Sequence, residues 1–129
     1  MPETVLPVFL EVAGERGLLP PGEVFVAFWC SAQWDLLSFS LDHGGCSVAL
    51  MDPCGICRRA ALSGATGVIF AHNHPSGDTA FSDEDIKVTK KNQMALASMG
   101  LTLVDHIIIG QNPDGSLTYR SMRGRGVLL

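Results

Sequence analysis

The chain has 129 residues, a mass of 13.8 kDa and a formal net charge of −4 at pH 7. Apolar residues make up 47% of the sequence and charged residues 17%, a balance that excludes disordered, collagen-like and coiled-coil proteins. The length fits one domain with a proper hydrophobic core, and fourteen glycines and seven prolines predict the many turns of an α/β or α+β architecture.

Charge and hydropathy disfavour two functional classes. A pI near 5.4 creates a field that repels phosphate backbones, whereas nonspecific nucleic-acid binding depends on several Lys and Arg contacts to phosphates. The longest apolar run, residues 24–30, is far shorter than the roughly 20 residues that cross a bilayer. The N-terminal segment 1–4 lacks the basic region of a signal peptide. We therefore expect a soluble, cytoplasmic protein that binds neither nucleic acid nor membranes.

Strands and helices alternate along the predicted chain. In order, the expected elements are helix 2–18, strand 23–31, strand 33–42, a weaker strand 46–51, helix 53–63, strand 66–71, helix 82–99, strand 101–109 and strand 116–121. The first helix is indicated by Val5, Phe9 and Val12 at helical spacing. The clearest helix has Ser82 as its N-cap and Gly100 as its C-terminal stop. This order predicts a single-domain mixed β-sheet flanked by helices.

One segment has the residue types and spacing of a metal site: His72-x-His74, followed after seven residues by Ser82-x-x-Asp85. Side chains two residues apart in an extended segment point the same way, so His72 and His74 can present two imidazoles to one ion. A turn at residues 75–77 can return the chain so that Asp85, in the first turn of the next helix, adds a carboxylate oxygen. Two His and one Asp leave a fourth position for water, as in catalytic zinc sites, although Fe or Co would also fit.

Each half of this pattern also has a simpler explanation. A His-x-His pair is by itself weak evidence for a metal. Ser82-x-x-Asp85 alone is more typical of a capping box, in which the acid accepts a hydrogen bond from the N-cap amide. The two halves together, joined by a strand, a turn and a helix, favour a metal site.

The sequence resembles the JAMM (MPN+) domain of the RadC family. Three blocks carry this similarity, His72-Asn73-His74-Pro75-Ser76-Gly77-Asp78, Ser82-Asp83-Glu84-Asp85-Ile86 and Asp105-His106-Ile107-Ile108-Ile109-Gly110. The similarity spans residues 20–126. It implies a JAMM/MPN-type α/β/α fold for a domain of residues 20–129, on which the N-terminal helical segment 1–19 packs.

The resemblance also implies a chemistry. The zinc ligands would be His72, His74 and Asp85, while Ser82 would stabilise the oxyanion and Glu23 would be the general base. Periodicity alone does not select Glu23 from the other glutamates. The implied activity is hydrolysis of an amide or isopeptide bond in a peptide or protein-conjugate substrate, with one zinc ion per chain. RadC proteins commonly carry a helix-hairpin-helix region, for which this chain has no room, so we expect no DNA contact.

The alternative function is a non-catalytic metal-binding module for protein interaction. A less favoured one is a dithiol redox protein, because Cys54 and Cys57 form a Cys-x-x-Cys motif at a helix start. Ordinary reduced thiols explain this motif more simply. Asp105 and His106 are neighbours in an apolar strand, so at most one of them can easily face the site. The simpler interpretation of His106 is a core histidine held by hydrogen bonds, and the alternative is a role in orienting a metal ligand.

Overall fold

The structure, a computed structural model, describes residues 2–14, 22–43 and 52–126. Its helices and strands are α1 (Pro2–Ala13), β1 (Val24–Cys30), β2 (Leu36–His43), α3 (Pro53–Ser63), β3 (Gly67–Asn73), α4 (Asp83–Ser98), β4 (Thr102–Gln111) and β5 (Leu117–Ser121). The strands form one mixed sheet in the order β2-β1-β3-β4-β5. β3 and β4 pair in parallel, and the other neighbouring strands pair antiparallel. The α/β single-domain fold expected from the sequence is confirmed.

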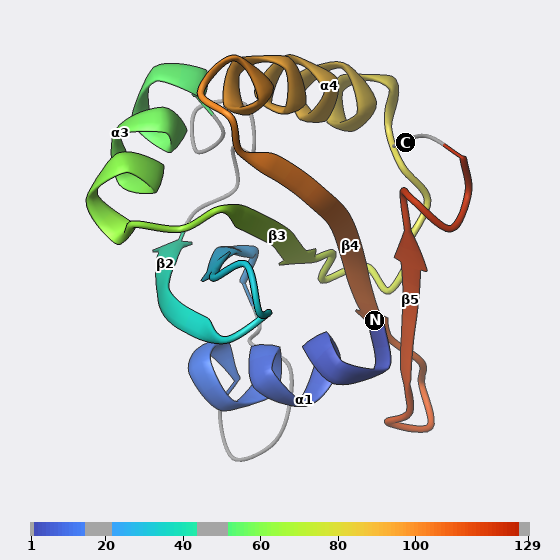
Figure 1. Ribbon diagram of the computed structural model, residues 1–129. Helices are drawn as coiled ribbons and strands as arrows, with labels where there is room; N and C mark the ends of the chain where they lie inside the picture. The colour runs from blue at the N-terminus through green and yellow to red at the C-terminus, as the bar shows by residue number, and fades with distance from the viewer. Residues whose placement is uncertain (1, 15–21, 44–51, 127–129) are drawn as a thin grey trace.

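The sheet lies between two helical layers, with α1 on one face and α3 and α4 on the other (Figure 1). On the first face, Val5 and Phe9 of α1 join an apolar cluster with alternate residues of β1 and β3. On the second face, Ile56 of α3 and Val88 of α4 join a cluster that includes Phe70 of β3. The two clusters are separate because successive strand residues point to opposite faces of a sheet. No helix in the described part of the chain is long and apolar enough to span a membrane.

The observed elements differ from the predicted ones at a few ends. β3 continues through Asn73, two residues further than predicted, because His72 pairs with Phe25 of β1 on one side and Ile108 of β4 on the other. β2 begins at Leu36 because the preceding residues form a turn, in which Ser31 Oγ accepts hydrogen bonds from two backbone amides. The predicted strand 46–51 lies outside the described residues.

The topology brings three chain segments to one edge of the sheet. β3, α4 and β4 form a parallel crossover unit, so the connection from β3 to α4 lies beyond the carboxyl ends of both strands. β1 runs antiparallel to β3 with Phe25 opposite His72, so β1 begins at this same edge. The end of β3, the start of α4 and the residue before β1 therefore meet there.

Candidate metal centre

Glu23, His72 and His74 form the candidate metal centre at this edge. One ligand atom from each residue lies within 4.8 Å of those of the other two. His72 is buried at the end of β3, while Glu23 and His74 are partly exposed. Two imidazole nitrogens and a carboxylate oxygen are donors that suit a borderline divalent cation. These three residues could hold a metal ion.

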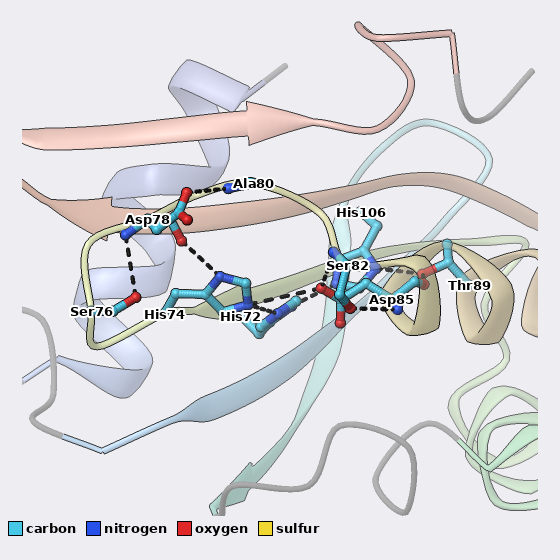
Figure 2. Close-up of polar contacts among 9 residues, drawn as sticks. All are labelled: His72, His74, Ser76, Asp78, Ala80, Ser82, Asp85, Thr89 and His106. Carbon is cyan, nitrogen blue, oxygen red and sulfur yellow. Dashed lines mark hydrogen bonds and ion pairs between the residues drawn. The ribbon is translucent and has the colours of Figure 1, made fainter.

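The two histidine rings have the spacing that a shared ion needs. His72 Nε2 lies 2.9 Å from His74 Nε2, and the two rings meet edge to face with 63° between their planes (Figure 2). Nitrogens bound to one tetrahedral zinc ion lie about 3.3 Å apart, so the pair would need to open by only a few tenths of an ångström. The donor set and its spacing therefore fit a metal ion.

His74 is oriented by the loop that follows it. Its Nδ1 lies 2.8 Å from the carbonyl oxygen of Asp78, which can only accept a hydrogen bond, so Nδ1 carries the hydrogen in this contact. In the neutral ring, Nε2 then presents a lone pair toward His72 and Glu23. The backbone amide of His74 donates to the carbonyl of Ile109 at the end of β4, which ties the loop to the sheet.

A close approach of two glycines holds the same loop. A Cβ atom on Gly110 of β4 would lie 2.6 Å from the carbonyl oxygen of Gly77, a distance that no side chain tolerates without a shift of backbone. Gly77 itself has φ of 83°, in the left-handed region that favours glycine. Gly110 therefore lets the loop that carries His74 lie directly against β4.

Asn73, which lies between the two histidines, holds the backbone on both sides of Glu23. Its Oδ1 accepts a hydrogen bond of 2.7 Å from the amide of Val24, and its Nδ2 donates one of 3.0 Å to the carbonyl of Gly22. Asn73 is buried, so its bond to Val24 is shielded from water, while its bond to Gly22 is partly buried. Its alternation with the histidines indicates that it points away from them, but no sequence signal connects it to Glu23, 50 positions earlier.

Ser82 and Asp85 form the capping box that the sequence also allows. Ser82 Oγ accepts from the amide of Asp85 at 2.9 Å, and Asp85 Oδ2 accepts from the amide of Ser82 at 3.0 Å. The same Oδ2 lies 4.0 Å from His74 Nε2. Asp85 thus borders the centre without belonging to the group of three, and its role as a ligand stays a prediction. Ser82 is exposed and its Oγ acts as an acceptor in this box, so its hydroxyl hydrogen can still be donated.

The structure separates the two neighbours on β4. His106 lies against His72, with its Nε2 2.7 Å from His72 Nδ1. The carboxylate of Asp105 instead accepts hydrogen bonds from the Ser121 hydroxyl and the Arg123 amide, which tie β4 to the C-terminal turn. Of the two, His106 faces the centre and Asp105 does not contact it.

Burial keeps the inner histidines neutral. Desolvation lowers the pKa of His72 to about 4, helped by the nearby charge of His74 and opposed by that of Asp85. Burial likewise lowers the pKa of His106, and repulsion from the two other histidines adds to the effect. Neutral imidazole is the form that binds metals, so the environment of His72 suits a ligand at neutral pH.

The Cys-x-x-Cys motif is not part of this centre. Cys54 is exposed and Cys57 is half-buried at the start of α3. Burial, followed by the charge of Cys54, raises the pKa of the Cys57 thiol. Both thiols are free in the structure, and neither belongs to the Glu23, His72 and His74 group.

Comparison with known proteins gives a consistent result. Residues 2–127 match the family described as RadC-like JAB domain. A UPF0758 protein of Stenotrophomonas maltophilia is 37% identical over 101 residues, which are 78% of this chain and 43% of the relative. A UPF0758 protein of Syntrophomonas wolfei is 30% identical over 128 residues, which are 98% of this chain and 52% of the relative. The chain spans about half the length of these curated relatives. With its fold, its Glu-His-His group and this match over nearly its whole length, the chain belongs to the RadC family as a RadC-like JAB domain.

Proposed function

We propose that this chain is a zinc-dependent hydrolase of amide or isopeptide bonds. The observation that carries the proposal is the convergence of Glu23 with two histidines whose Nε2 atoms lie 2.9 Å apart. A carboxylate beside a pair of metal-binding imidazoles is the arrangement that metal-assisted hydrolysis needs. The similarity to the JAMM/MPN superfamily, through the RadC-like JAB domain, supports the same reaction class.

His72, His74 and Asp85 would hold the ion in this proposal. When bound, zinc lowers the pKa of a coordinated water toward ~7 and polarises a carbonyl oxygen. Glu23 takes the proton of the attacking water and returns it to the leaving amine. Ser82 donates its hydroxyl hydrogen to the oxyanion that develops on the substrate. His106 orients His72 from behind, and the substrate is a peptide or a protein conjugate.

A second candidate is a metal-binding module for protein interaction, without catalysis. One specific observation favours it. A carboxylate oxygen of Glu23 lies within 4.8 Å of a ring nitrogen of each histidine, while the carboxylate of Asp85 accepts a hydrogen bond in a capping box. If Glu23 binds the metal, no general base remains in the centre.

The substitution Glu23→Gln separates the two candidates. It keeps the size and hydrogen bonding of the side chain but removes the base. For a hydrolase, we expect about one zinc per chain before and after the change, and a fall in cleavage of roughly 10²–10⁴-fold. Cleavage would be followed on a panel of peptides and isopeptide-linked conjugates, and zinc by elemental analysis. Glu11→Gln, an exposed change on α1, is the matched control.

Three results would contradict the hydrolase. Loss of zinc in Glu23→Gln would make Glu23 a ligand and favour the interaction module. Equal cleavage by the wild type and Glu23→Gln would exclude Glu23 as the base. A wild type that holds one zinc per chain and cleaves no member of the panel would again favour the interaction module.

A further inference from the structure

A chain of buried polar contacts leads from His72 toward α4. His72 Nδ1 lies 2.7 Å from His106 Nε2, and His106 Nδ1 lies 2.8 Å from the hydroxyl of Thr89 (Figure 2). The Thr89 hydroxyl in turn lies 2.6 Å from the backbone carbonyl of Asp85, one helical turn earlier in α4. His72, His106 and Thr89 are each at most 1% exposed. The chain therefore connects β3, β4 and α4 inside the core.

The hydrogens available to this chain can be counted. Five contacts run in series, through Asp78 O, His74, His72, His106, Thr89 and Asp85 O. Both ends are carbonyl oxygens, which only accept hydrogen bonds. With the three rings in the neutral form that binds metals, each ring and the hydroxyl carry one hydrogen, which makes four hydrogens for five contacts. One contact in the series therefore has no hydrogen.

The contact without a hydrogen is the one between the two Nε2 atoms. At 2.6 Å from a carbonyl oxygen, Thr89 must donate there, so its oxygen accepts from His106 Nδ1. His106 Nε2 then has no hydrogen and accepts from His72 Nδ1. His72 Nε2 is left with a lone pair that faces the lone pair of His74. Such a pair repels unless a cation lies beside both nitrogens.

We propose that Thr89 is a positioning residue for the metal centre: acting through His106, it fixes His72 as the tautomer whose Nε2 lone pair faces the ion. This inference rests on the metal site of the proposed function but not on hydrolysis. The hydroxyl is the necessary feature of Thr89. A serine would still donate to the Asp85 carbonyl and accept from His106, whereas a valine of nearly the same shape could do neither.

Two measurements on the zinc-loaded protein test the proposal. Long-range ¹H–¹⁵N correlation spectra report which ring nitrogen carries the hydrogen, and we expect Nδ1 for both His72 and His106. Competition with a chelator gives the zinc Kd. We expect Thr89→Val to lose the hydrogen on His106 Nδ1 and to raise the zinc Kd by about 10–100-fold, as for other groups that orient metal ligands. Thr89→Ser should restore both the tautomers and the affinity.

Thr102→Val is the control. It makes the same substitution at the start of β4, the end of this strand that lies away from the metal centre, and should leave the zinc Kd unchanged. A hydrogen on Nε2 of His106 in the zinc-loaded wild type would overturn the proposal. Because this measurement uses the wild type, it does not depend on whether a variant folds. An unchanged Kd in folded Thr89→Val would overturn it as well. If zinc and tautomers behave as expected but nothing is cleaved, the inference stands and the hydrolase fails. If cleavage and Kd are both unaffected by Thr89→Val, the hydrolase stands and the inference fails.

Discussion

The two faces of the sheet differ in the polarity of their buried side chains. The face beneath α1 is apolar, with Val5 and Phe9 packed on the strands, and beside them lies an apolar cavity of about 230 Å³. The face beneath α3 and α4 has an apolar cluster of similar kind, but its edge carries the buried polar chain of His72, His106 and Thr89. One sheet thus supports an inert core on one side and a polar centre on the other.

This difference indicates where function has shaped the core. Burying a polar group destabilises a protein unless the group is hydrogen-bonded, and apolar residues of similar shape often give equal or greater stability. The α1 face follows this rule. By the same rule, the polar chain on the α4 face gives no stability that an apolar cluster would lack, and it passes through His72 and His74 of the Glu23, His72 and His74 group. We therefore place its role in the proposed metal centre rather than in packing.

Removing a proposed ligand should have the largest effect on the metal centre of the polar face. His74→Ala is expected to reduce zinc from about one per chain to none, because the partly exposed imidazole is half of the facing nitrogen pair. Metal bound only to the folded state stabilises it, so a chelator should lower the Tm of the wild type. The same chelator should leave the Tm of His74→Ala unchanged. Full zinc content in His74→Ala would remove this residue from the site.

Truncating a core residue should instead break the apolar face alone. Phe9 of α1 is fully buried against the sheet. Phe9→Ala is expected to lower the free energy of unfolding by about 3–5 kcal/mol, measured by urea denaturation, through lost burial and a cavity. The folded fraction should keep its zinc. Leu62→Ala is the control, since Leu62 of α3 is 88% exposed and its loss should change stability by at most about 0.5 kcal/mol. Zinc loss in folded Phe9→Ala would show that the two faces are coupled.

A change at Gly110 should displace the polar face without touching a ligand. The added Cβ would meet the carbonyl of Gly77 at 2.6 Å and push away the loop that carries His74. We expect Gly110→Ala to raise the zinc Kd by about tenfold, a cost typical of disturbing the groups that orient metal ligands. Gly55→Ala in α3 is the control, because the nearest atom to its Cβ lies at an ordinary 3.8 Å. An unchanged Kd in Gly110→Ala would mean that the loop can move without affecting His74.

The comparison also shows what could be predicted from the sequence. Local rules suffice for the elements: the cap at Ser82 and the bounds of helix 53–63 are expected from residue types, and the structure confirms both. His72 and His74 were selected by a spacing of two in an extended segment, which is also a local rule. Helix periodicity and capping do not depend on distant parts of the chain, which explains this success.

The partners of the histidines follow from long-range pairing that local rules do not describe. Glu23 reaches the centre because β1 pairs antiparallel with β3 at one register. Thr89 meets His106 because α4 is packed over β4 at one rotation. Asn73 holds the backbone around Glu23 through bonds between segments 50 residues apart. The resemblance to a known family suggested Glu23, and the strand pattern left a role for His106 as an alternative, whereas Thr89 and Asn73 required the structure.

Changing both thiols of the Cys-x-x-Cys motif should have the smallest effect of all. Cys54 is exposed, Cys57 is half-buried at the start of α3, and neither thiol belongs to the Glu23, His72 and His74 group. We expect Cys54→Ser together with Cys57→Ser to leave zinc at about one per chain by elemental analysis, because the proposed ligands are nitrogen and oxygen atoms. The free energy of unfolding should change by at most about 1 kcal/mol, since little apolar surface is removed. A fall in zinc to well below one per chain would place the metal on thiolates, and it would contradict the proposed site at His72, His74 and Asp85.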